Sequence, residues 1–148
     1  MGNVLAMQIC DNYLCNAIIC SKVFKNGSLL KKINCLKHIL NSLSKLKKWQ
    51  KIYKHNFHHR YLFIKGLLFE TIGFNKYAKG YYSNALKELE HSNTLMDNGI
   101  FFEYIAQFYL KTNNINQAKY YLQQSLDSYS KWGAHAKVEH LNQSFVIN

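Results

Sequence analysis

The sequence predicts an all-α fold of antiparallel helical hairpins stacked as a short superhelix. The chain of 148 residues contains no Pro and only seven Gly, so it lacks the residues that close the many tight turns of an all-β protein. Its apolar residues recur at helical spacing over long stretches. With 48% apolar and 18% charged residues, its composition is that of a folded domain, and we expect a single domain over residues 1–148.

The N-terminal part, residues 1–58, is predicted to hold two basic helices. Residues 3–25 form the first, which Asn26-Gly27-Ser28 ends, and Ser28 then caps the second. The second helix carries apolar residues at spacings of three and four that we expect to pack on neighbouring helices: Leu29, Leu30, Ile33, Leu36, Ile39, Leu40, Leu43 and Leu46. Residues 47–58 mix polar and aromatic residues and are expected to contain a short break.

A pattern of small and aromatic residues repeats at an interval of forty in the second half of the chain. Gly66, Phe69, Gly73, Ala78, Tyr82 and Ala85 recur as Ala106, Tyr109, Asn113, Ala118, Leu122 and Ser125. These offsets resemble those of the tetratricopeptide (TPR) motif, in which small residues let two helices approach closely and bulky residues fill the space between them. Two TPR-like hairpins are therefore predicted, over residues 59–96 and 97–131.

Each hairpin is predicted to consist of a helix, a turn and a second helix. The first comprises Leu62–Thr71, the turn Gly73–Tyr77 and Ala78–Ser92. The second comprises Ile100–Lys111, the turn Thr112–Ile115 and Asn116–Ser130, with Asp97-Asn98-Gly99 as the turn between the repeats. A closing helix, Ala134–Phe145 within residues 132–148, is expected to cap the stack, because two repeats alone do not enclose a core.

Longer strings of residues resemble one family. The string Tyr121-Leu122-x-x-Ser125-x-x-x-Tyr129-x-x-Trp132-Gly133-Ala134-x-Ala136-Lys137-Val138-x-x-Leu141 is similar to the end of the long helical region in multi-sensor signal-transduction (serine/threonine and histidine) kinases. Leu46-Lys47-Lys48-Trp49, Asn56-Phe57-x-His59-Arg60-Tyr61 and Glu103-x-x-Ala106-x-Phe108-Tyr109 resemble upstream stretches of the same region. The resemblance covers about residues 45–142.

In that family a protein-kinase-like domain and an AAA-type ATPase region precede the helical region, and GAF and histidine-kinase domains follow it. The resemblance implies that this chain corresponds to a detached piece of such a protein. A gene fragment, a degenerate copy and a free-standing adaptor all remain open.

Catalytic motifs are not found in the sequence. It lacks the G-x-x-x-x-G-K loop that cradles phosphates, and the string nearest to a kinase catalytic loop, His59-Arg60-Tyr61, has a ring where the base must stand. His55, His58 and His59 have the spacing to share a helix face, but the Glu of an H-E-x-x-H zinc site is missing. We therefore expect no catalytic residue, no metal and no cofactor.

Cysteine usage and hydropathy favour a soluble, cytoplasmic protein. No apolar run approaches the length needed to span a bilayer, so no membrane partner is expected. The cysteines form no C-x-x-C pair, and we expect all four to be small buried residues: Cys10, Cys15, Cys20 and Cys35.

The formal net charge of +11 leaves a second function open, that of a basic helical-repeat protein that binds nucleic acid. Residues 1–60 contain ten Lys and Arg60 against the single acid Asp11. Lysines near Trp49, Tyr53, Phe57 and Tyr61 offer phosphate-neutralising charge beside rings that stack on bases. These rings lie in the family-like stretch, where packing between helices is the simpler expectation, so nucleic acid is the less favoured partner.

The favoured hypothesis is a non-catalytic module that binds a peptide segment or a neighbouring signalling domain. Partner-binding residues are expected on the first helix of each hairpin: Leu62, Leu67, Phe102 and Gln107. Structural roles are expected for the small residues at the helix contacts and for the residues that dock the closing helix: Gly66, Ala78, Ala85, Ala106, Ala118, Trp132, Gly133, Ala134 and Lys137.

Overall fold

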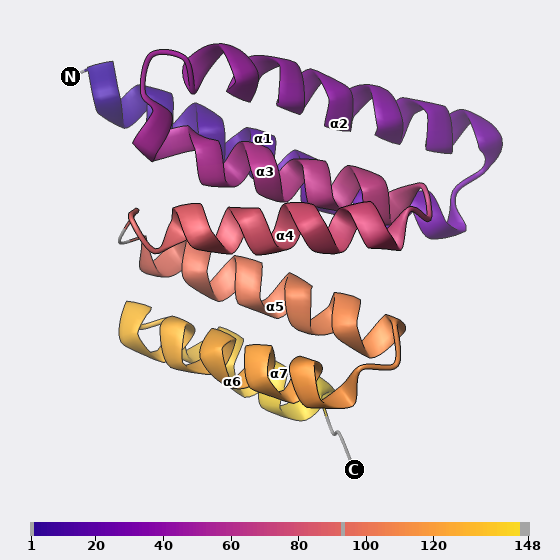
Figure 1. The fold of residues 1–148 in the computed structure, drawn as a ribbon, viewed down its shortest axis with the longest axis vertical. Coiled ribbons are helices and arrows are strands. Elements are labelled where there is room, and N and C mark those ends of the chain that lie inside the picture. The colour runs from indigo at the N-terminus through magenta and orange to yellow at the C-terminus, as the bar shows by residue number, and fades with distance from the viewer. Residues whose placement is uncertain (1, 93, 146–148) are drawn as a thin grey trace. The chain divides into compact units, whose positions relative to one another are not determined.

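The computed structural model describes residues 2–92 and 94–145, and within these ranges the chain consists of seven helices and no strand (Figure 1). The prediction of an all-α fold is confirmed. The helices are α1 (Gly2–Asn26), α2 (Leu29–Trp49), α3 (Lys54–Thr71), α4 (Asn75–Leu89), α5 (Leu95–Lys111), α6 (Ile115–Trp132) and α7 (His135–Ser144). Residue 1 of the predicted N-terminal segment, residue 93 of the first hairpin and residues 146–148 of the closing segment lie outside the described residues.

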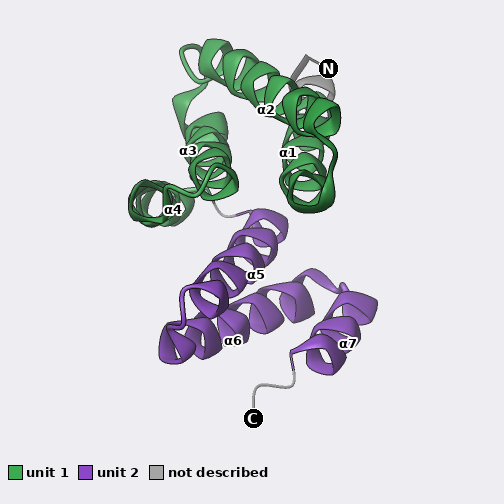
Figure 2. Cartoon of the chain, turned by 90° about the vertical axis from the view of Figure 1, so that its right-hand side faces the viewer, with its two compact units in different colours: residues 1–92 green, residues 93–148 purple. Residues whose placement is uncertain are grey.

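The chain divides into two compact units, residues 1–92 and 93–148 (Figure 2). In unit 1, helices α1, α2 and α3 pack on one another, and α4 pairs with α3 as an antiparallel hairpin. In unit 2, helices α5 and α6 form the second hairpin, and α7 packs against α6.

The three N-terminal helices are held together by aromatic and ionic contacts. The Trp49 ring of α2 lies 5.9 Å from the Tyr13 ring of α1 and 5.7 Å from the Phe57 ring of α3. The Arg60 guanidinium, which is buried, lies 2.7 Å from the carboxylate of Asp11. One residue of each helix thus contributes to an aromatic cluster, and an ion pair ties α1 to α3.

Helix α2 buries only one side of its long apolar stripe, so the expectation that the whole stripe packs is wrong. The buried members are Ile39, Leu43 and Leu46, and Leu36 is half-buried. Leu29, Leu30, Ile33 and Leu40 are exposed. A helix turns about 100° per residue, so these eight positions spread over more than one face, and α1 and α3 cover only one of them.

The two hairpins share their turn geometry at an interval of forty residues. Gly73 and Asn113 both adopt the left-handed conformation, with φ of 87° and 58°. In each turn the next amide donates to a carbonyl near the end of the first helix, Phe74 N to Phe69 O at 2.8 Å and Asn114 N to Tyr109 O at 2.9 Å. Glycine and asparagine are the residues that adopt this conformation with least strain.

The helix contacts of both hairpins are lined by small residues. Ala78, Ala85, Ala106 and Ala118 are fully buried, and Gly66 is buried as well. Ser125 occupies the position that corresponds to Ala85, and its hydroxyl donates a hydrogen bond of 2.8 Å to the Gly99 carbonyl across the second hairpin.

The turn predicted at Asp97-Asn98-Gly99 is wrong, because all three residues lie inside α5. Asp97 stands in the first turn of the helix, where the positive end of the helix dipole stabilises a carboxylate. Gly99 provides room for a ring, since a Cβ built there would lie 2.7 Å from the Tyr129 ring. The break between the hairpins falls before Leu95 instead.

The four cysteines differ in burial. Cys15 is exposed and Cys20 half-buried, so only Cys10 and Cys35 are the buried residues expected of all four cysteines. Burial and the adjacent Cys35 raise the pKa of the Cys20 thiol to about 11.

Among the described residues, no helix combines the length and the apolar character that crossing a bilayer requires.

Candidate functional site

An aromatic face lies on the hairpin of α3 and α4, made by Phe69, Phe74, Tyr77 and Tyr81. Phe69 stacks on Tyr81 at 5.3 Å with an interplanar angle of 7°, and on Tyr77 at 5.5 Å. Phe74 meets Phe69 and Tyr77 edge-on at 6.5 and 6.2 Å. Because Phe74 and Tyr77 are 54% and 59% exposed, the stack extends from the hairpin into solvent.

A lysine extends the aromatic face along α3. The Lys65 ammonium lies 4.9 Å from the Tyr81 ring centroid and 5.3 Å from the Tyr61 ring centroid, and it donates a hydrogen bond to the Tyr81 hydroxyl at 3.3 Å. Burial lowers the pKa of Lys65, but the hydrogen bonds to Tyr81 and Tyr61 outweigh it, so the net pKa is raised. The face thus carries a fixed positive charge beside its rings.

The second hairpin carries a shorter stack at the corresponding place. Tyr109 and Tyr121 stand forty residues after Phe69 and Tyr81, and their rings stack at 5.5 Å with an angle of 2°. Phe102 stacks on Tyr121 at 6.0 Å. The counterparts of the exposed Phe74 and Tyr77 are Asn114 and Gln117, and the exposed ring of the second hairpin is instead Tyr120, which meets Tyr121 edge-on at 5.1 Å.

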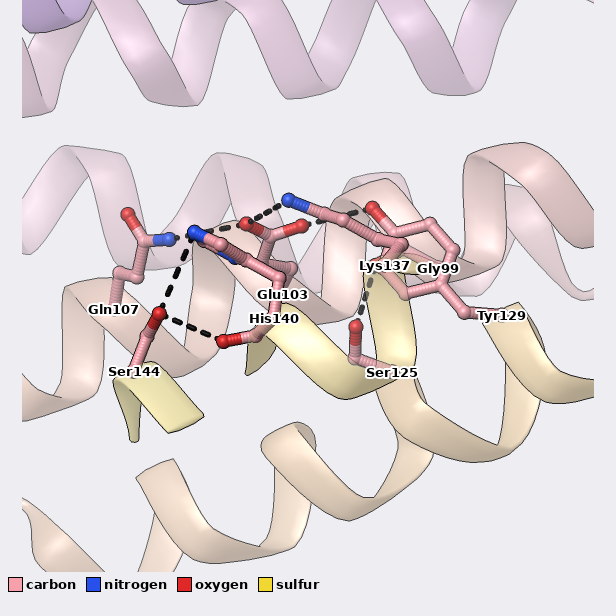
Figure 3. A network of polar contacts seen from close by, with 8 residues as sticks. All are labelled: Gly99, Glu103, Gln107, Ser125, Tyr129, Lys137, His140 and Ser144. Carbon is pink, nitrogen blue, oxygen red and sulfur yellow. Dashed lines mark hydrogen bonds and ion pairs between the residues drawn. The ribbon is translucent and has the colours of Figure 1, made fainter. Parts of the chain in front are cut away.

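A buried carboxylate organises unit 2 (Figure 3). Glu103 of α5 accepts hydrogen bonds from the Tyr129 hydroxyl of α6 at 2.8 Å, from the Lys137 ammonium of α7 at 3.0 Å and from the Gln107 amide at 3.4 Å. One acid therefore links all three helices of the unit.

Its neighbours give this carboxylate a structural role. Burial, followed by the negative charge of Glu103, raises the pKa of Tyr129 far above its ordinary value, so this phenol stays protonated and donates. Hydrogen bonds from Tyr129, Lys137 and Gln107 satisfy the carboxylate oxygens. A charged group that is buried and fully bonded in this way stabilises the packing of the helices.

The expected partner-binding residues fall into three environments. Leu67 is only 2% exposed and belongs to the core of unit 1, so assigning it to partner binding is wrong. Leu67 follows Arg60 by seven residues, or about two helical turns, so it lies on the same face of α3 as Arg60, which pairs with Asp11 of α1. Leu62 and Phe102 are half-buried. Gln107 is half-buried and bonded to Glu103.

The residues expected to dock the closing helix also differ in their surroundings. Gly133 ends α6 in the left-handed conformation with φ of 83°, and Ala134 caps the start of α7. Lys137 bonds Glu103, and Leu141 is buried. Trp132 is 50% exposed, although its ring lies 6.4 Å from that of Tyr129.

The three histidines near the start of α3 do not converge. His59 is buried, whereas His55 is exposed. His58 Nδ1 forms a hydrogen bond with Gln50 at 2.7 Å, and burial lowers the pKa of this ring, with Lys54 and His59 acting in the same direction against Glu88. Within the described part of the chain, no three His, Cys, Asp or Glu side chains come together as a metal site.

Two features of the site were missed by the sequence analysis, although both leave a signal in the sequence. In the first hairpin the Tyr82 hydroxyl donates to Glu70, as the Tyr129 hydroxyl does to Glu103 in the second. In the sequence, Gly66-x-x-x-Glu70 and Gly99-x-x-x-Glu103 share one spacing, which places a glycine and a carboxylate one helical turn apart. The exposed pair Phe74 and Tyr77 flanks the start of α4, where a solvent-facing position would favour polar residues.

Comparisons with known proteins do not assign the chain to a family. No protein family matches the chain, and no match is found among curated proteins or among solved structures.

Proposed function

We propose that this chain is a non-catalytic, TPR-like scaffold that acts in the cytoplasm and binds a peptide segment or a neighbouring protein domain. The observation that carries the proposal is the aromatic face of α3 and α4, where four contacting rings reach solvent beside Lys65. Rigid rings are frequent anchors of protein interfaces because they bury a large area with few rotatable bonds.

The arrangement of the rings supports an extended peptide as the ligand. Phe69 and Tyr81 are half-buried and held by the hairpin, whereas Phe74 and Tyr77 remain exposed. Grooves lined by aromatic side chains recognise extended, proline-rich segments, whose stiff backbone loses little entropy on binding. The Lys65 ammonium adds a site for a peptide carboxylate or carbonyl.

Selection of peptides on the full chain tests this proposal. Peptides selected from a phage library should lose about tenfold or more in affinity for the double variant Phe74→Ser/Tyr77→Ser, because each exposed ring is an anchor. Ile52→Ser is the matched control, since Ile52 is exposed outside the aromatic face. Peptides that bind the double variant as tightly as the wild type would contradict the proposal.

We also propose that the chain derives from the helical region of multi-sensor signalling kinases. The support is the similarity over about residues 45–142, in particular the string from Trp132 to Val138. The neighbouring coding sequence provides the test. Reading frames for a kinase-like domain and an ATPase upstream, or for sensor domains downstream, would support this origin, and unrelated neighbours on both sides would speak against it.

Charge keeps nucleic acid as a second candidate partner. No Asp or Glu occurs from Asn12 to Phe69. However, Phe57 and Arg60 are buried and Trp49 packs between two rings, so these three groups are engaged in helix packing, whereas the lysines around them and Tyr53 remain exposed. Retention of a single-stranded oligonucleotide that falls steeply with added salt would support this candidate over the scaffold.

A further inference from the structure

Helix α2 presents a second apolar surface, separate from the aromatic face. We define the α2 seam as Leu29, Ile33, Leu36 and Leu40. Leu29 is 73% exposed, Ile33 and Leu40 are exposed, and Leu36 is half-buried. Large aliphatic side chains that remain in water along one helix indicate a surface that binds something.

The spacing of the seam is that of a coiled coil. Its members follow one another at intervals of four, three and four residues, as the a and d positions of a heptad do. Such a stripe is narrow and runs nearly parallel to the helix axis for about 17 Å, at 1.5 Å per residue. A narrow stripe of this kind fits a second helix laid along it.

Charge indicates which kind of helix fits. Lys37 lies beside the seam on its exposed flank, and Lys47 and Lys48 lie on the same helix beyond its C-terminal end. Helix α2 contains no carboxylate. A partner helix with Asp or Glu beside its apolar positions would pair with these lysines across the interface.

We propose that the α2 seam docks an amphipathic helix of a partner protein with leucine-type residues facing the seam and carboxylates flanking them. A second copy of this chain would bring lysine against lysine. Nucleic acid would meet aliphatic side chains, which neither neutralise phosphate nor stack on bases. A membrane favours a broader apolar face with aromatic residues, and the aromatic residue of α2, Trp49, is packed against Tyr13 and Phe57.

A designed peptide tests the proposal on the full chain. The probe is a fluorescein-labelled peptide of four heptads with Leu at a and d and Glu at e and g, measured by fluorescence anisotropy at physiological salt. It should bind saturably, and a matched peptide with Lys in place of Glu should bind about tenfold more weakly or less.

The variant Ile33→Lys separates seam docking from plain charge attraction. This change adds a positive charge but interrupts the seam, so docking predicts binding about tenfold weaker. Simple attraction of an acidic peptide to a basic protein predicts equal or tighter binding, which would overturn the proposal. Ile19→Lys is the matched control, because Ile19 is exposed on α1 outside the seam, and it should bind as the wild type does.

A second copy of the chain, a membrane or a nucleic acid bound at the α2 seam would each give a different result. Dimerisation in light scattering, binding to vesicles of equal parts phosphatidylcholine and phosphatidylglycerol, or binding of a uridine oligonucleotide would each overturn the proposal if Ile33→Lys abolished it. Absence of saturable binding by the acidic peptide would also overturn it. The double variant Phe74→Ser/Tyr77→Ser should bind the acidic peptide normally, so this test does not depend on the aromatic face.

Discussion

Each hairpin contains a tyrosine ring that packs over a glycine of the facing helix, but this contact lies at a different place along each hairpin. In α3–α4 the Tyr82 ring lies over Gly66, and its hydroxyl donates to Glu70 at 2.6 Å. In α5–α6 the Tyr129 ring lies over Gly99, and its hydroxyl donates to Glu103 at 2.8 Å. The first contact lies towards the C-terminal end of α3, near the connecting turn. The second lies near the N-terminal end of α5, far from its turn.

This difference shows that two spacings are superimposed in one chain. The turns repeat after forty residues, whereas the glycines and the glutamates repeat after 33, from 66 to 99 and from 70 to 103. The position that corresponds to Tyr82 is Leu122, and the position that corresponds to Gly66 is Ala106. A tyrosine ring thus determines where the partner helix needs a glycine, independently of the repeat.

The two contacts also differ in burial, which predicts the largest effect. Glu103 is buried and bonded by three donors, whereas Glu70 is half-exposed. Glu103→Ala should lower the free energy of unfolding of unit 2 by about 2–3 kcal/mol, because it leaves the Tyr129 hydroxyl buried without its acceptor. Glu70→Ala should lower that of unit 1 by about 1 kcal/mol, since Glu70 is partly exposed and water can take the place of its carboxylate beside the Tyr82 hydroxyl.

The two tryptophans report on the units separately, Trp49 in unit 1 and Trp132 in unit 2. Urea unfolding followed by fluorescence, in backgrounds where the other tryptophan is Phe, measures each loss. Equal losses for the two glutamate variants would show that burial does not distinguish the two contacts.

The glycines should give the next largest effect. A Cβ at Gly66 would lie 2.5 Å from the Tyr82 ring, and one at Gly99 would lie 2.7 Å from the Tyr129 ring. Gly66→Ala and Gly99→Ala should each destabilise their unit by about 1–2 kcal/mol through overpacking, despite the better helix propensity of alanine.

Gly80 provides the matched control for these substitutions. It lies within α4 with nothing near the position of a Cβ, so Gly80→Ala should stabilise unit 1 by up to about 1 kcal/mol. The same urea unfolding measures the three variants. If all three alanine substitutions stabilised the protein, neither tyrosine ring would lie in close contact with its glycine.

The contact between Tyr129 and Glu103 should make the stability of unit 2 depend on pH. Because burial raises the pKa of Tyr129 above its ordinary value of 10.0, the stability it contributes is complete below pH 10 and falls as pH rises above it. The reason is that the unfolded chain then releases a proton that the folded unit retains. Tyr129→Phe should make the decline of unit 2 stability above pH 10 shallower by about 1 kcal/mol per pH unit. If stability declined with pH at the same slope in the wild type and in Tyr129→Phe, the raised pKa of Tyr129 in the folded unit would be contradicted.

The smallest effect is expected at Lys137, whose side chain is partly exposed. Lys137→Gln should lower the stability of unit 2 by about 1 kcal/mol or less, because solvent screens the pair with Glu103. Hydrogen exchange of the α7 amides should become faster in this variant while that of the α5 amides changes little. Added salt should reduce the difference between wild type and variant, and a difference that grows with salt would argue against an ion pair.

Much of the fold was predictable, because it rests on local periodicity and turn chemistry. The forty-residue interval correctly placed the turns at Gly73 and Asn113, where the left-handed backbone restricts the choice of residue. The turn predicted at Gly99 was wrong because a glycine has two uses, and here it accommodates a ring within a helix.

The candidate site was less predictable, since it depends on contacts between segments that spacing does not reveal. The stripe on α2 appeared as one surface in sequence, and only the positions of α1 and α3 determine which half stays exposed. Leu67 has the character of a binding residue in sequence but faces the core. Glu103 gains its role from Tyr129 and Lys137, which are 26 and 34 residues away.

In each hairpin a tyrosine ring lies directly over a glycine, and nuclear Overhauser contacts between the two residues measure this arrangement. We expect contacts from the Gly66 α-protons to the Tyr82 ring protons and from the Gly99 α-protons to the Tyr129 ring protons, with no ring contact at Gly80. Absence of both glycine-to-ring contacts in the folded protein would contradict this account of how the hairpins close.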